Sequence, residues 1–250
     1  MPLRQLDFTY AYGFADRVVG AIYNFIPEEQ LYVHDHLEED GTSFATKVSN
    51  PCQVTLLHTF IRSINFSDFD YITGHYPEDG AETLAAFLDA AGLNVPAWLT
   101  ANHVRDHIRE LDRLLEEATA IVTNAAFHIL FADRRFLFGF QLMVAERVRE
   151  IQYDDHSDVL KRPGVPKRAS YLPPWLKRAV FHRDKGRCQR CFTDLSGILT
   201  TNDDLRIDHM LPLAEAGTND PTNFQLLCDS CNLGKSAQVV FDPQKIYTYW

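Results

Sequence analysis

Three features are missing from this sequence, and each absence excludes a class of protein. The longest apolar stretch, Ile121–Phe140, is interrupted by polar and charged side chains, so no segment approaches the ~20 apolar residues of a membrane span. The first residues, MPLRQLDFTYAYGF, contain no apolar core followed by a small-residue cleavage site. Internal repeats and low-complexity tracts are also missing. Since 46% of the 250 residues are apolar and 23% are charged, we expect a folded cytoplasmic protein.

Basic residues are scarce in the first part of the chain and concentrated in the second. Residues 1–150 hold 11 Lys+Arg against 22 Asp+Glu, whereas residues 151–250 hold 13 against 12. Within residues 161–190, ten basic side chains accompany a single acidic one, Asp184. A basic run standing alone is as often a solvated face or a linker as a binding site. Its density here favours a polyanion as partner, while the acidic part would be repelled by nucleic acid.

The chain has only five cysteines, and four of them form two closely spaced pairs. Cys188-x-x-Cys191 and Cys228-x-x-Cys231 can each place two thiolates on one side of a tight turn, whereas Cys52 is isolated and predicted to be a small buried side chain. Two such turns supply the four ligands of a tetrahedral zinc ion. A redox dithiol or two disulfides are the alternatives, and a reducing compartment disfavours both. With four sulfur ligands the coordination shell is closed, so the predicted zinc is structural.

Helical periodicity dominates the first part of the chain. We expect helices over residues 14–25 and 79–92, with Asp79 as the N-cap of the second and Gly92 after its end. Apolar residues at alternating steps of three and four predict a long helix over residues 104–129 and another over 137–151. The charged break at residues 133–135 would be the turn of an antiparallel helix pair.

These patterns predict an α+β protein in three parts. Residues 1–152 would form a mostly helical, acidic interaction or regulatory domain. Residues 153–174 are rich in proline, glycine and basic side chains, a composition typical of a linker. Residues 175–250 would form a small domain of a size that needs a metal to be stable.

A polar constellation lies between the two cysteine pairs. The pattern predicts a strand, a turn-rich loop, a returning strand and a helix, over Leu205–Leu211, Gly217–Pro221, Phe224–Leu227 and residues from Asp229 towards Val240 respectively. This order can bring Asp208 and His209, at the end of the first strand, against Asn232 on the first turn of the helix. A carboxylate, an imidazole and a carboxamide in a basic domain favour a divalent cation on oxygen ligands beside a general base.

This constellation resembles the HNH endonucleases with the ββα-metal finger, in the subset that also carries a four-cysteine zinc. The features that carry the resemblance are Arg183-Asp184 and Arg187 before the first cysteine pair, Asp208-His209, Pro212-Leu213, Gly217-Thr218-Asn219-Asp220, Asn223-Phe224-Gln225-Leu226-Leu227-Cys228, and Cys231-Asn232 followed by Lys235. They cover about 70 residues, roughly 172–240. Asn232 stands where the third signature residue is often histidine, a variant written HNN. Because asparagine offers a hard oxygen ligand, we expect Mg²⁺ or Mn²⁺ in the catalytic site.

The resemblance implies a metal-dependent endonuclease that hydrolyses phosphodiester bonds of double-stranded DNA. His209 would be the general base, and Asp208 and Asn232 would hold the catalytic cation. Asn223 would bond the loop backbone and so orient His209. Four basic side chains would contact phosphate without reading sequence: Arg183, Arg187, Arg190 and Lys235.

Two further expectations concern partners and the competing function. The acidic helical domain is expected to bind a protein partner or a second copy of the chain. HNH proteins with such an appendage resemble bacterial or phage proteins, including effector nucleases of bacterial defence systems. The alternative function is a catalytically inactive, zinc-stapled module that binds nucleic acid or acts as an adaptor. Replacing His209 with alanine would abolish cutting by a nuclease and would change nothing in an adaptor.

Overall fold

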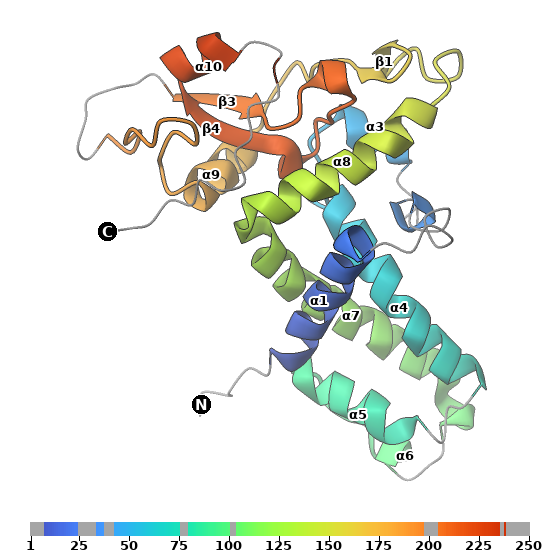
Figure 1. Cartoon of the computed structure of the whole chain (residues 1–250). Helices are drawn as coiled ribbons and strands as arrows, with labels where there is room; N and C mark the ends of the chain where they lie inside the picture. The colour runs from blue at the N-terminus through green and yellow to red at the C-terminus, as the bar shows by residue number, and fades with distance from the viewer. Residues whose placement is uncertain are drawn as a thin grey trace. The chain divides into compact units, whose positions relative to one another are not determined.

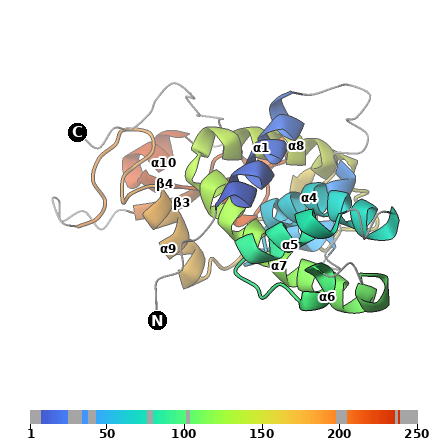
Figure 2. The ribbon, with the colours of Figure 1, turned by 90° about the horizontal axis from the view of Figure 1, so that it is seen from below.

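The computed structural model describes residues 8–24, 34–37, 43–75, 80–100, 104–197, 205–235 and 238 (Figures 1 and 2). Within these ranges the protein is mostly helical and has two small two-stranded sheets, which confirms the predicted α+β class. The chain forms two compact units. Unit 1 comprises Met1–Glu39 and Leu57–Leu130, and unit 2 comprises Asp40–Leu56 and Phe131–Trp250.

Unit 1 is helical throughout its described residues. Its elements are α1 (Thr9–Tyr23), η1 (His34–Leu37), α4 (Leu56–His75, from its second residue), α5 (Ala81–Ala90), α6 (Ala97–Thr100), η2 (Arg105–His107) and α7 (Ile108–Ala132, to Leu130). Phe87 of α5 stacks on Phe14 of α1 and on Phe69 of α4, with ring centroids 5.9 and 4.2 Å apart. The predicted end of α5 is confirmed, since Gly92 follows it with φ +80°. The predicted N-cap Asp79 lies outside the described residues, and Gly80 caps the helix.

The long helix predicted after residue 104 is α7, preceded by the short turn η2. Its buried side chains, Leu111, Leu115, Ala118 and Val122, recur at the predicted helical spacing. The segment Arg105–Ala132 is long and apolar enough to cross a membrane by length and composition alone. Half of its apolar window is buried inside the protein, and one such helix among the described residues is weak evidence for a membrane span.

Helix α8 (Arg134–Glu150) begins at the predicted break and belongs to unit 2. Asp133 is its N-cap, and the carboxylate accepts hydrogen bonds from the backbone amides of Arg135 and Phe136. Since α7 lies almost entirely in unit 1, the antiparallel pairing of α7 with α8 stays a prediction. The buried face of α8 is apolar except for one residue, Gln141.

The segment predicted to be a linker folds as part of unit 2. Strands β1 (Leu160–Arg162) and β2 (Val165–Pro166) form an antiparallel hairpin, and Gly164 in its turn has φ +68°. Leu160 is fully buried. The composition, poor in apolar residues, predicted that this segment would make no core contact. Leu160 is nevertheless buried in unit 2, and the backbone groups of Lys167 and Ala169 form hydrogen bonds with Asn219. The observed units therefore differ from the predicted boundaries: residues 40–56, α8 and residues 153–174 belong with the C-terminal residues.

The C-terminal part of unit 2 is a hairpin between two helices. Strand β3 (Leu205–His209) pairs antiparallel with β4 (Phe224–Cys228), so that Leu205 faces Cys228 and His209 faces Phe224. Helix α9 (Pro174–Arg183) lies on one side of the hairpin and α10 (Asp229–Lys235) on the other (Figures 1 and 2). Leu176, Val180, Cys188, Leu195, Phe224, Leu226, Leu227 and Cys228 form its buried core.

The loop between β3 and β4 is packed into unit 2. It contains the short turns η3 (Leu213–Glu215) and η4 (Pro221–Asn223), and residues 218–223 are completely buried or nearly so. Helix α3 (Phe44–Ser49) and the residues after it contact this loop. The amide of Asn219 donates to the carbonyl of Val48 at 2.8 Å, and the amide of Leu56 donates to Oδ2 of Asp220 at 2.7 Å. Residues far apart in sequence therefore form one core around the loop.

Candidate functional site

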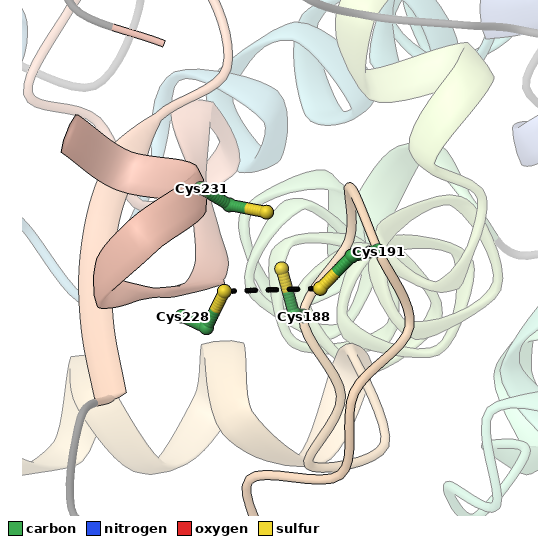
Figure 3. Close-up of side chains that lie close together, drawn as sticks. All are labelled: Cys188, Cys191, Cys228 and Cys231. Atoms are coloured by element: carbon green, nitrogen blue, oxygen red, sulfur yellow. Dashed lines mark hydrogen bonds between the residues drawn. The ribbon is translucent and has the colours of Figure 1, made fainter. Parts of the chain in front are cut away.

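The four paired cysteines meet in one cluster. The Sγ atoms of Cys188, Cys191, Cys228 and Cys231 all lie within 4.8 Å of one another (Figure 3). Zinc–sulfur bonds of about 2.3 Å in a tetrahedron place sulfurs about 3.8 Å apart, and Cys191 and Cys228 lie 3.7 Å apart. Disulfide-bonded sulfurs would be separated by about 2.05 Å. The cluster therefore fits a structural zinc ion with a closed coordination shell.

Local structure presents each cysteine pair to the cluster. In the first turn Phe192 adopts φ +62° and its amide donates to the carbonyl of Cys188 at 2.8 Å. Cys228 is the last residue of β4, and Cys231 lies on the first turn of α10. Arg190 joins the two turns, because its Nη1 donates to the carbonyl of Cys231 at 3.2 Å. Burial and the neighbouring cysteines raise the pKa of Cys231 and so disfavour its thiolate. A bound cation would offset this effect by stabilising the thiolates.

Asp208 lies at the end of β3 and is joined to α10 through Lys235. The Lys235 ammonium donates to Oδ2 of Asp208 at 2.7 Å and to the carbonyl of His209 at 2.9 Å. The lysine is 2% exposed. This position differs from the predicted phosphate contact, because both hydrogen bonds direct the ammonium to the end of β3 instead of to solvent. A carboxylate accepts several hydrogen bonds or ligands, so Oδ1 of Asp208 can still bind a cation.

His209 is the last residue of β3 and is buried, with 3% of its surface exposed. Its Nε2 lies 3.1 Å from Oδ1 of Asn219, and its ring packs on Phe224 with centroids 4.6 Å apart. Burial lowers the pKa of His209 to about 4, against the opposing effect of the hydrogen bond with Asn219, and the positive charge of Arg168 lowers it further. The imidazole is therefore neutral at neutral pH, the form that a general base needs.

Asn223 bonds the backbone of the loop between β3 and β4. Its Oδ1 accepts from the amide of Leu211, and its Nδ2 donates to the carbonyls of Leu211 and Thr218, each at 2.9 Å. Asn223 thereby fixes the backbone that leaves β3 two residues after His209.

Asn232 is half-buried on the first turn of α10. It precedes Lys235 by three residues and so lies on the same face of the helix. Because Lys235 contacts Asp208, this face of α10 is directed to the end of β3. The placement is compatible with a cation shared by Asp208 and Asn232, whose hard oxygen atoms suit Mg²⁺ or Mn²⁺.

The predicted phosphate-binding arginines have different environments. The Arg183 side chain is 1% exposed: it forms two hydrogen bonds with Asp184 and lies over the ring of Phe131. Asp184 also accepts from the amide of Leu226 at 2.7 Å, so this pair joins α9 to β4 and differs from the predicted phosphate contact. Arg187 and Arg190 are half-buried. Basic side chains of the same segment that are exposed are Lys161, Arg162, Lys167, Arg168, Lys177, Arg178 and Lys185.

No role was predicted from the sequence for two residues near the site, Asn219 and Gln141. Asn219 contacts His209 directly, and Gln141 of α8 bonds the hydroxyls of Thr218 and Thr222 at 2.9 and 2.8 Å. Asn219 belongs to the Gly217-Thr218-Asn219-Asp220 stretch, which indicated a turn and carries part of the family resemblance, but no role in the site was predicted for it. The signal for Gln141 was that it is polar although it lies on the otherwise apolar, buried stripe of α8.

Comparison with known families finds a match in the C-terminal part of the chain. Residues 188–238 match the family model described as HNH endonuclease, and the clustered cysteines are consistent with its zinc-binding subset. Neither the curated proteins nor the solved structures yield a match. HNH domains act on nucleic acids, and the family implies metal-dependent nuclease activity.

Proposed function

We propose that the HNH endonuclease domain formed around residues 188–238 makes this chain a metal-dependent endonuclease that cuts double-stranded DNA in the cytoplasm. One observation carries the proposal. A neutral imidazole and a carboxylate, His209 and Asp208, lie side by side at the end of β3, and α10 is fixed against them through Lys235. Structural roles alone would not require all of these groups at one strand end in a domain that matches nucleases.

The proposed roles follow from phosphodiester hydrolysis. His209 takes a proton from the water that attacks phosphorus, and Asn223 holds the loop that orients it. Asp208 and Asn232 would hold Mg²⁺ or Mn²⁺, whose positive charge would stabilise the negative charge that develops at the phosphate during hydrolysis. Lys235 balances the charge of Asp208 and keeps α10 close to β3.

The proposed DNA surface is the exposed basic part of residues 161–190. Lys161 and Arg162 extend from the β1–β2 hairpin, and Lys177 and Arg178 from α9. Arg168 is both exposed and near enough to His209 to affect its pKa, which places a cation beside the proposed site. Such contacts position the DNA backbone and do not select sequence.

Cleavage of supercoiled plasmid by the zinc-loaded protein, with Mg²⁺ or Mn²⁺, tests the proposal. We expect the wild type to nick or linearise the plasmid and His209→Ala to lose at least about 100-fold in rate, the usual contribution of a general base. His128→Ala is the matched control, because His128 is exposed on α7 in unit 1. If wild type and His209→Ala bind DNA equally and neither cuts, the chain is the inactive module instead.

We further propose that unit 1 binds a basic protein partner or the basic segment of a second copy. It holds 6 Lys+Arg against 18 Asp+Glu, a net charge of −12, whereas residues 161–190 carry a net charge of +9. Self-association through these charges would weaken as salt screens them. Sedimentation at low and high ionic strength tests it, since a monomer at both would exclude the second copy. We also propose that the chain acts as an effector nuclease of a bacterial defence system, the role that its resemblance to HNH proteins with such an appendage implies.

A further inference from the structure

We infer that Asn219 is a positioning residue that holds His209 as the tautomer protonated on Nε2, leaving Nδ1 as the atom that accepts a proton. The inference rests on the proposed nuclease function only for its catalytic consequence; the tautomer itself follows from hydrogen bonds. Asn219 is fully buried in the loop between β3 and β4. Its Oδ1 lies 3.1 Å from Nε2 of His209.

The orientation of the Asn219 amide is fixed by three other groups. Its Nδ2 lies 2.7 Å from the carbonyl oxygen of Lys167 and 3.0 Å from that of Ser49, and its Oδ1 lies 3.1 Å from the amide nitrogen of Ala169. Carbonyl oxygens only accept hydrogen bonds and a backbone amide only donates. Rotating the carboxamide by half a turn would place its oxygen against two carbonyls and its amino group against an N–H. The network therefore excludes the flipped amide.

The amide orientation determines the proton on the imidazole. Oδ1 of Asn219 can only accept, so Nε2 of His209 must donate to it. A neutral imidazole has one N–H, which leaves the lone pair on Nδ1. In the proposed reaction the attacking water can then give its proton only to Nδ1. The opposite tautomer would present an N–H to that water and could not act as a base.

The groups that orient Asn219 come from outside the matched domain. Ser49 ends α3, and Lys167 and Ala169 follow β2, whereas the family match begins at residue 188. The amide of Asn219 also donates to the carbonyl of Val48 at 2.8 Å. Two segments that precede the nuclease domain in sequence thus hold the residue that orients its general base.

NMR of the full-length, zinc-loaded protein labelled with ¹⁵N tests the tautomer directly. In long-range ¹H–¹⁵N spectra at about pH 8 we expect Nε2 of His209 to be protonated and Nδ1 unprotonated, with the signals assigned by their loss in His209→Ala. A wild-type imidazole protonated on Nδ1 would overturn the inference, whatever the activity of the protein.

Two substitutions separate positioning from a purely structural role. Asn219→Ala removes the acceptor for Nε2, so we expect both tautomers to be populated and the cleavage rate to fall about 10- to 100-fold, as for other groups that orient a catalytic side chain. Asn219→Asp keeps the acceptor but loses the bonds to Ser49 and Lys167. We expect it to lower the unfolding midpoint as Asn219→Ala does and yet to retain the Nε2–H tautomer.

The outcomes distinguish this inference from the proposed function. The Nε2–H tautomer in a protein that never cuts would contradict the nuclease and leave the inference intact. A tautomer that is the same in wild type and Asn219→Ala, or a cleavage rate that does not change when the tautomer does, would contradict the inference. Asn124→Ala, on the exposed face of α7, is the matched control and should alter neither.

Discussion

At the scale of single residues, burial decides whether a basic side chain near the site can meet substrate. Arg183 and Arg178 lie on the same helix, α9, and the sequence offers the same charge at both positions. Arg183 is enclosed and bonded to Asp184, whereas Arg178 is exposed. Lys235 is likewise buried and bonded to a carboxylate, that of Asp208. Two side chains that were predicted to contact phosphate, Arg183 and Lys235, thus lie against carboxylates.

Substituting the two α9 arginines should therefore have opposite effects. Arg183→Ala leaves Asp184 buried without its main partner, and we expect the free energy of unfolding to fall by about 3–5 kcal/mol. Arg178→Ala should change stability by less than about 0.5 kcal/mol, while it weakens DNA binding and reduces the salt dependence of affinity by about one unit of slope. Urea unfolding and fluorescence anisotropy at several salt concentrations measure the two quantities. Equal loss of stability in both variants would refute this assignment.

At the scale of elements, the sequence predicted what is specified locally. The cysteine spacing predicted the cysteine cluster, the charged break at residues 133–135 located the boundary between α7 and α8, and the apolar period located α7. It did not predict that residues 160–166 form a hairpin in unit 2, with Leu160 and Pro166 buried. The contacts that hold this segment are distant in sequence, since Lys167 bonds Asn219. Asn219 also bonds Ser49, 170 positions away, and no local sequence pattern indicates a contact of that range.

The loop between β3 and β4 depends on a close backbone approach at Gly217. A Cβ atom added there would lie 2.0 Å from the carbonyl oxygen of Leu211, and backbone cannot move aside as the end of a flexible side chain can. We expect Gly217→Ala to displace the loop, with loss of stability and of cleavage. Gly13→Ala is the control, because its Cβ would meet nothing within 4 Å and an exposed helical site gains about 1 kcal/mol from alanine. A fully active and stable Gly217→Ala protein would show that the loop is not constrained as described.

The zinc site should be required for the fold of the C-terminal hairpin and not for chemistry. Native mass spectrometry is expected to find one zinc ion per chain, and Cys228→Ser to lose it together with the core that contains Cys188 and Leu226. Cys52→Ser should keep the metal, since Cys52 lies outside the cluster. Metal retained by the Cys228 variant would show that the four sulfurs do not form the ligand set.

At the scale of the whole molecule, the residues that surround the site are drawn from three parts of the sequence. Residues 40–56, α8 and the C-terminal residues share one compact unit, and the polar side chains of the loop bond all three. The family match covers only residues 188–238 of this unit. The part of the chain that matches the HNH endonuclease family is therefore expected to fold together with residues 40–56 and 131–174, and not as the separate domain 175–250 that composition predicted.

Hydrogen exchange should reveal this shared unit. Gln141→Leu removes the bonds from α8 to Thr218 and Thr222 and leaves buried hydroxyls with fewer partners, at a cost of about 1–3 kcal/mol. Because parts of one cooperative unit open together, protection should fall in parallel for peptides covering residues 44–56 and 217–224. Gln152→Leu, an exposed position after α8, should leave both unchanged. If protection fell in the loop alone, residues 40–56 would open independently, and the orientation of Asn219 could not depend on Ser49.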